Sequence, residues 1–155
     1  MNDIVLDTNV LLHTNNKNNE YYESANICLN LILERDLSLC FDDVFNPVES
    51  KNTSVIGSEY FGKIQNGTFA YVFLMDRLIK GKYVQVIKKN YNKAKIELNK
   101  IIKNRHDISF VITAFGSQGK LLISNDYTDF KQNTRKYISK KFQVSILDSD
   151  EYSTS

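Results

Sequence analysis

Residues 4–12 read IVLDTNVLL, and three polar side chains stand there between two apolar segments. The segment before Asp7 is short and unbroken, as expected of a central parallel strand that is covered on both faces. A polar group at the carboxyl end of such a strand lines the crevice where open α/β sheets bind ligands. The structural alternative is that Asp7 or Thr8 caps a following helix. The stretch predicts a buried parallel strand that ends in a polar edge.

The rest of the chain alternates between short apolar runs and longer segments in which apolar residues have helical spacing. We expect further strands within residues 37–41, 81–87, 120–124 and 143–147. We expect helices within residues 21–35, 88–102, 107–119 and 134–142. Alternation of this kind predicts the α/β class, here a three-layer α/β/α sandwich with a mainly parallel five-stranded sheet. Residues 53–68, which contain three glycines, show no clear pattern.

The composition is that of one ordinary globular domain. A chain of 155 residues, 42% hydrophobic and 25% charged, can bury one core and argues against disorder and against membrane insertion. We expect a domain over residues 1–148 and a polar tail over residues 149–155. No apolar run approaches the roughly 20 residues of a membrane span, and a secretory pattern is lacking, so we expect a cytoplasmic protein. Cys28 and Cys40 are expected to be buried thiols.

Three more acidic residues stand at places where chemistry and structure compete as explanations. Asp126 follows the apolar run LLIS, and an ordinary Asx turn would also explain it. Asp107 stands at the head of an apolar helix, where an acid is favourable for the helix dipole. Glu49 follows the second strand, and with Asn46 and Pro47 it could form a capping box. Each acid alone has a structural explanation, and their order along the chain adds weight to a functional one.

That order resembles the PIN-domain nucleases, including the VapC-type toxins of bacterial toxin–antitoxin pairs. The resemblance rests on VLDTNVLL, on an acid after the second strand and on DISFVITAFGSQGKLLISNDYTDF, and it spans residues 4–147. It implies a PIN-like fold and carboxylates that hold a divalent metal and serve catalysis. These carboxylates are Asp7, Glu49, Asp107 and Asp126. It also implies supporting residues around the cluster, namely Thr8, Asn9, Ser124 and Asp129.

The chemistry of such a cluster agrees with the resemblance. Carboxylates packed closely together resist joint ionisation, so four of them require a cation at neutral pH. Oxygen ligands alone favour one or two Mg²⁺ or Mn²⁺ ions over zinc, and such a site suits phosphodiester hydrolysis. Asp7 and Asp126 would be the principal ligands. Asp129 would act from outside the ligand set, because a fifth ligand adds repulsion.

The expected function is cleavage of RNA by a metal-dependent endoribonuclease. The resemblance also implies the role of a toxin that is restrained by an antitoxin, and a homodimer. Two alternatives stay open, namely a PIN-like module that binds RNA or protein without cutting, and a nuclease for single-stranded DNA. A phosphatase or response-regulator-like domain would need a lysine at a strand end beside the acids, and neither LLISND nor VLDTN provides one.

A nucleic-acid substrate requires cationic contacts, because phosphate contacts supply most of the affinity. The sequence has two groups of basic residues that could serve, and for the first of them a solvated lysine face is the structural alternative. The first group lies within and just after the helix expected over residues 88–102, and its candidates are Lys88, Lys89, Lys93, Lys100, Lys103 and Arg105. The second group comprises Arg135, Lys136, Lys140 and Lys141.

Overall fold

Five short strands form one sheet in the computed structural model, which describes residues 2–87 and 91–155. The strands are β1 (Asp3–Leu6), β2 (Ser38–Asp42), β3 (Tyr83–Val86), β4 (Leu121–Ile123) and β5 (Ser145–Leu147). Their order is β3-β2-β1-β4-β5, and all four pairings are parallel. The predicted five-stranded sheet is confirmed, and it is parallel throughout.

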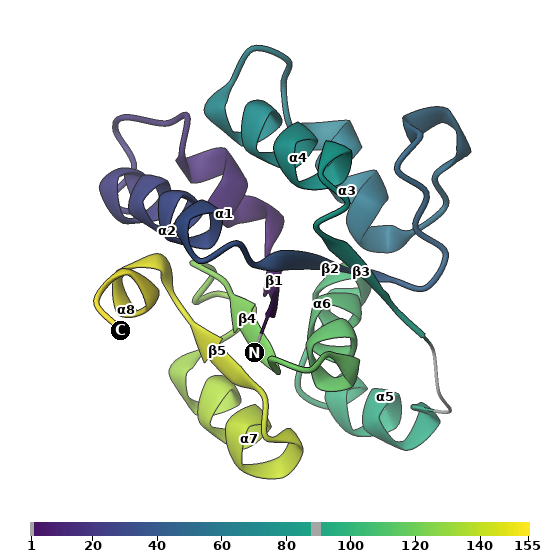
Figure 1. Ribbon diagram of the computed structural model, residues 1–155. Helices are drawn as coiled ribbons and strands as arrows, with labels where there is room; N and C mark the ends of the chain where they lie inside the picture. Colours follow the sequence, from purple (N-terminus) through teal and green to yellow (C-terminus); the bar gives the residue numbers. More distant parts are fainter. Residues whose placement is uncertain (1, 88–90) are drawn as a thin grey trace.

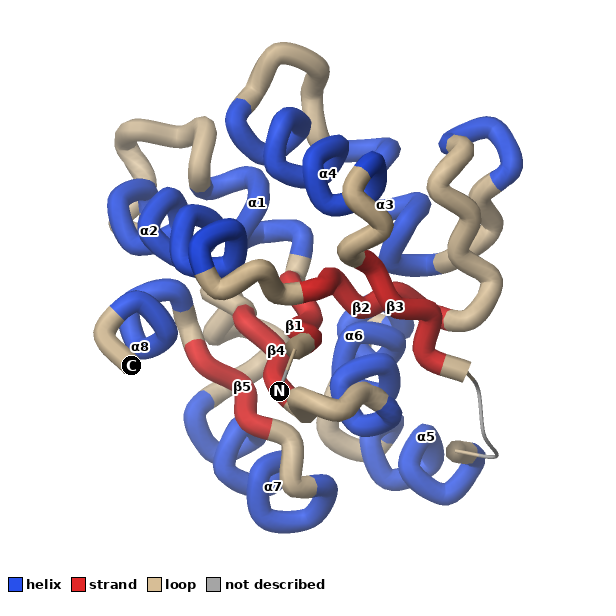
Figure 2. Tube along the Cα trace, viewed as in Figure 1, coloured by secondary structure: helices blue, strands red, loops and turns tan. Residues whose placement is uncertain are grey.

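Eight α-helices of the described residues surround the sheet (Figures 1 and 2). They are α1 (Thr8–His13), α2 (Tyr22–Glu34), α3 (Val55–Lys63), α4 (Phe69–Ile79), α5 (Asn92–Asn99), α6 (Arg105–Gly116), α7 (Gln132–Phe142) and α8 (Ser149–Ser153). A short 3-10 helix, η1, spans Glu49–Lys51. Figure 1 shows α1, α2, α4 and α8 on one side of the sheet and α5, α6 and α7 on the other. The predicted three-layer α/β/α architecture is confirmed.

The stretch IVL of residues 4–6 is the centre of the core, as predicted. Ile4, Val5 and Leu6 are completely buried, because helices cover both faces of β1. Burial of each such side chain contributes roughly 1.5–3 kcal/mol to folding. β1 lies between β2 and β4, and Leu6 is in register with Ile123. The residues that follow β1 and β4 therefore meet at one edge of the sheet.

Residues 53–68, which showed no clear pattern, contain helix α3. The side chain of Ser54 accepts a hydrogen bond from the Gly57 amide at 2.8 Å and caps the helix. The Asp42 carboxylate at the end of β2 accepts two more, from the amides of Val55 at 2.7 Å and Ile56 at 3.0 Å. A Cβ on Gly57 would lie 2.6 Å from the Asn52 side chain, so this helical glycine permits a close approach. The Ser54 cap and the Asp42 carboxylate together stabilise the start of α3, a helix that its residue composition only weakly predicts.

The expectation of a polar tail over residues 149–155 is not met, because most of these residues form α8. Asp148 caps the helix in a capping box with Glu151. Tyr152 is buried, and α8 packs against α2. Cys28 and Cys40 are buried free thiols, as predicted. Among the described residues, no helix has the length and apolar character that a membrane crossing requires.

Candidate metal centre

Three hydrogen bonds hold Asp7 at the polar edge of the sheet. Its amide donates a hydrogen bond to the Ile123 carbonyl at 2.9 Å, which continues the pairing of β1 and β4. The Ser124 hydroxyl and the Asn9 side-chain amide both donate to Asp7 Oδ2, at 2.7 Å and 2.9 Å. Asp7 is the N-cap residue of α1 by position, yet its side chain makes no capping hydrogen bond. The alternative that Asp7 caps the helix is therefore wrong, and its carboxylate faces the site.

Asp126 closes a turn directly after β4. Its Oδ1 accepts hydrogen bonds from the Thr128 amide at 2.8 Å and the Asp129 amide at 3.1 Å, which is the predicted Asx turn. The Asp126 amide in turn donates to the Ser124 hydroxyl at 3.2 Å. The turn brings Asp129 back beside Asp126. The structural and the chemical explanation of Asp126 are thus compatible.

Asp107 lies in the first turn of α6, in the helical layer that also contains α5 and α7. The cap of this helix is Asn104, whose Oδ1 accepts a hydrogen bond from the His106 amide at 2.9 Å. Asp107 is therefore free of capping, and its Oδ2 is buried without a hydrogen-bond partner among the described residues. A buried carboxylate oxygen with no donor is costly unless a cation or water satisfies it.

Asp107, Asp126 and Asp129 form a group that could hold a metal ion. Each offers a carboxylate oxygen, and these three oxygens lie within 4.8 Å of one another. An all-oxygen donor set suits a hard divalent cation, and the unpartnered Oδ2 of Asp107 fits the same occupant. Asp129 was expected to act from outside the ligands, and the structure places it inside this group.

The acids of the site oppose one another's ionisation, as predicted. Burial raises the pKa of Asp7 to about 6, and the charges of Asp126 and Glu59 raise it as well, against the hydrogen bond from Ser124. The pKa of Asp107 is also raised, first by burial and then by the neighbouring Asp129 carboxylate. Both effects favour protons or a cation over bare carboxylates.

Glu49 is not brought to this group. It lies exposed in η1, whose preceding residue Val48 makes no side-chain cap. Asn46 accepts a hydrogen bond from the Val48 amide at 2.8 Å, which forms a local turn rather than the predicted capping box. The helix that the motif Asn46, Pro47 and Glu49 indicated is a single 3-10 turn.

Glu59 of α3 is the acid that faces the site in its place. Its charge acts on Asp7, and its side chain is only 12% exposed. Its Oε2 lies 2.8 Å from Lys63 Nζ, and its Oε1 lies 3.5 Å from His106 Nδ1. Helical periodicity from Ser54 onward is the only sequence signal for it, and Gly57 and Gly62 weaken that signal.

Two buried side chains fix the backbone around the acids. The Tyr60 hydroxyl of α3 donates a hydrogen bond to the Leu6 carbonyl, one residue before Asp7. Arg135 of α7 donates from Nε to the Phe130 carbonyl at 2.7 Å and from Nη2 to the carbonyls of Ser124 and Asp126, both at 3.0 Å. Arg135 is only 5% exposed, so the prediction that it binds nucleic acid is wrong.

The remaining predicted residues are placed as follows. Thr8 is buried and its Oγ1 has no hydrogen-bond partner within residues 2–87 and 91–155. Asn9 and Ser124 support Asp7 through the hydrogen bonds given above. Lys93, Lys100, Lys103 and Arg105 are exposed, while Lys88 and Lys89 lie outside the described residues. Lys100 Nζ lies 3.3 Å from the Glu97 carboxylate and is neutralised by it.

Comparison with protein-family models, with curated proteins and with solved structures gives no match. A fold of this class hosts many unrelated activities, so function has to be argued from the site itself. The donor set, the unpartnered Asp107 oxygen and the raised pKa values carry that argument.

Metal-free protein is expected to lose stability as the pH rises, and Asp7→Asn should remove part of this loss. The pKa of Asp7 is raised from 3.8 to about 6 in the folded state, so its contribution is fully present below pH 4. The contribution is lost as the pH rises through 6, and the shift corresponds to at most about 3 kcal/mol. Urea unfolding in EDTA at pH 4 and pH 7.5 measures it.

Asp7→Asn keeps a side-chain oxygen that can accept from Ser124 and Asn9. The variant should match the parent protein at pH 4 and exceed its free energy of unfolding at pH 7.5. Addition of Mn²⁺ at pH 7.5 should stabilise the parent more than the variant, because the variant has one negative charge fewer beside the three acids of the group. A variant that is less stable than the parent at both pH values in EDTA would contradict the conclusion that the ionised Asp7 carboxylate destabilises the metal-free fold.

Proposed function

We propose that the protein is an endoribonuclease that hydrolyses RNA phosphodiester bonds with one or two Mg²⁺ or Mn²⁺ ions. The observation that carries the proposal is the meeting of three carboxylate oxygens from α6 and the β4 edge within 4.8 Å, beside the buried Asp7. The order of the acids along the chain, which resembles the PIN-domain nucleases, supports it independently.

Asp107, Asp126 and Asp129 would hold the cation, whereas Asp7, expected from the sequence to be a principal ligand, is not in that group and would add charge from the end of β1. A bound divalent ion supplies charge that neutralises phosphate oxygens and makes a water more acidic. Asp107 Oδ2, which has no hydrogen-bond donor among the described residues, would face the cation, and another carboxylate oxygen of the site would accept a proton from the attacking water. Ser124 and Asn9 hold the Asp7 carboxylate in one orientation by donating to the same oxygen.

RNA is the favoured substrate because the resemblance implies it and because basic residues lie beside the acids. Arg105 lies on α6 two residues before Asp107, so a polyanion bound at the start of this helix would meet a cationic side chain. The proposal includes a cytoplasmic location, an antitoxin partner and a homodimer, all of which rest on the sequence alone. A non-cleaving module or a nuclease for single-stranded DNA is the alternative outcome.

The test is incubation of the protein with labelled single-stranded RNA, single-stranded DNA and a phosphomonoester, each with Mn²⁺ and with EDTA. We expect internal cuts in the RNA with Mn²⁺ and none in EDTA. Hydrolysis of the phosphomonoester alone, cleavage of the DNA alone, or RNA binding without any cleavage would each contradict the proposal.

A further inference from the structure

A groove of about 590 Å³ lies between α3, α5 and α6. Lys95 and Asn99 of α5 line it on one side, and Arg105 and His106 line it at the start of α6. The groove adjoins the candidate metal centre in two ways. Arg105 and His106 directly precede Asp107, and His106 Nδ1 lies 3.5 Å from Glu59.

The two cations of this groove are free of carboxylates. Within residues 2–87 and 91–155, neither Lys95 nor Arg105 forms an ion pair. Other lysines of the same basic stretch are neutralised: Lys82 pairs with Asp36 at 2.5 Å, and Lys100 pairs with Glu97 at 3.3 Å. Lys95 is half-buried, while Lys93 on the same helix is exposed and does not line the groove. Unneutralised charge in a concave site attracts an anion.

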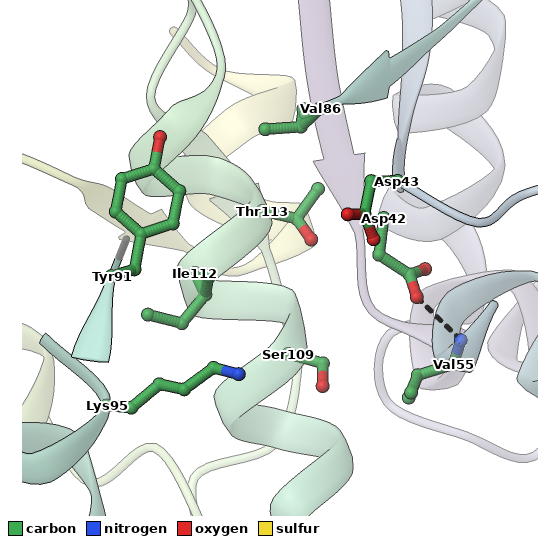
Figure 3. A pocket seen from close by; sticks show the side chains of 9 residues that line it. All are labelled: Asp42, Asp43, Val55, Val86, Tyr91, Lys95, Ser109, Ile112 and Thr113. Atoms are coloured by element: carbon green, nitrogen blue, oxygen red, sulfur yellow. Dashed lines mark hydrogen bonds between the residues drawn. The ribbon is translucent and has the colours of Figure 1, made fainter. Parts of the chain in front are cut away.

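The groove continues into a more enclosed cavity of about 60 Å³, because Val55, Lys95 and Ser109 line both. Figure 3 shows the Lys95 side chain extending from α5 toward Ser109, and the Asp43 carboxylate pointing toward Thr113. The neighbouring Asp42 carboxylate is occupied by the amides at the start of α3.

The Asp43 carboxylate accepts no such hydrogen bonds from backbone amides of the described residues. Its Oδ1 is buried without a hydrogen-bond partner among the described residues. The Asp43 carboxylate therefore lines the inner cavity with hydrogen-bond acceptor capacity that the described residues do not use. The carboxylate also repels any phosphate that approaches it. The inner cavity therefore favours a hydrogen-bond donor, and the outer groove favours an anion.

We propose that one nucleotide of a single RNA strand lies along this groove beside the scissile bond, with its phosphate at Arg105 and Lys95 and its base edge toward Asp43. The assignment rests on the proposed function. Phosphate contacts position the strand, and contacts to the base edge provide sequence preference.

The size and lining of the inner cavity set the kind of base that it takes. Its volume of about 60 Å³ is small beside the 590 Å³ of the outer groove, so we expect it to take the edge of a base while the rest of the nucleotide stays in the groove. The side chains of Tyr91, Val86 and Ile112 line it with apolar surface. A carboxylate accepts from the exocyclic amino group of cytosine, and uracil has a carbonyl oxygen at that position. We therefore expect the groove to prefer cytosine to uracil.

The phosphate contacts are tested by fluorescence anisotropy with a labelled single-stranded RNA in EDTA, where no cleavage is expected. Lys95→Gln and Arg105→Gln should each weaken binding to every RNA sequence and reduce the slope of log K against log salt by about 0.7. Lys93→Gln is the matched control and should leave the slope unchanged. Equal losses in Lys93→Gln and Lys95→Gln would overturn the groove, as would unchanged binding in both groove variants.

The base contact is tested by comparing oligocytidine with oligouridine in the same assay. The parent protein should bind oligocytidine about tenfold more tightly, the low end of the discrimination that one good base contact gives. Asp43→Asn should bring the ratio toward one without changing the salt slope. Equal binding of the two oligomers by the parent protein overturns the role of Asp43 without the use of any variant.

The binding tests of the groove and the cleavage test of the proposed function can fail independently. If the parent protein cuts RNA with Mn²⁺ while all three groove variants bind and cut as it does, the groove is wrong and the nuclease stands. If Lys95→Gln and Arg105→Gln lose RNA binding while the parent protein cuts nothing, the groove stands as an RNA site and the nuclease is wrong.

Discussion

Asp126→Asn is expected to abolish Mn²⁺-dependent cleavage of RNA and to leave the fold intact. The substitution removes one negative charge from the group that could hold the metal. It keeps an oxygen that can accept from the amides of Thr128 and Asp129, so the turn after β4 should persist. Removal of an outer partner typically costs 10–100-fold in activity, and we expect a loss beyond about 100-fold. Cleavage rates over a Mn²⁺ titration, with circular dichroism as the test of folding, measure this.

Asp129→Asn is the companion variant for the same titration. If Asp129 acts from outside the ligands, as its sequence position suggests, the loss should be roughly 10–100-fold. The carboxylate of Asp129 lies in the same group as those of Asp107 and Asp126, and on that ground we expect a loss as complete as that of Asp126→Asn. Full activity of Asp126→Asn at saturating Mn²⁺ would refute the metal centre itself.

Glu59→Gln is expected to reduce cleavage strongly, and Glu49→Gln is expected to leave it unchanged. Glu59 is 12% exposed and its charge acts on Asp7, whereas Glu49 is exposed in η1. Glu59 also lies 3.5 Å from His106, the residue before Asp107. A partner of this kind typically contributes 10–100-fold, so we expect a loss in that range. Both variants make the same chemical change, which makes Glu49→Gln the matched control.

The test should also separate the charge of Glu59 from its ion pair with Lys63. Lys63→Gln removes that ion pair, in which Lys63 Nζ lies 2.8 Å from Glu59 Oε2. The variant keeps the Glu59 carboxylate. Since the lysine is 55% exposed, we expect little change in cleavage from this variant. A loss of activity in Glu49→Gln together with full activity in Glu59→Gln would contradict the assignment of the acids made here.

The sequence by itself determined the sheet and three of the acids. Buried parallel strands are short apolar runs, and IVL of residues 4–6 and LLI of residues 121–123 have that pattern. Polar residues that follow such strands can only lie at the carboxyl edge of the sheet. Asp7 and Asp126 were therefore placed by local pattern, and Asp107 was placed by its position at the head of an apolar helix.

Only the tertiary structure decided which of the other charged residues belong to the site. Glu49 and Glu59 both follow β2, and the choice between them depends on where α3 packs against β2 and α6. Arg135 looked like part of a basic surface, yet its guanidinium binds three backbone carbonyls inside the protein. Lys95 is half-buried and lines a groove between α3, α5 and α6, whereas Lys93 on the same helix is exposed and lies outside it. The physical reason is that a side chain's partners come from elements distant in sequence, so its burial and free charge arise only when those elements pack.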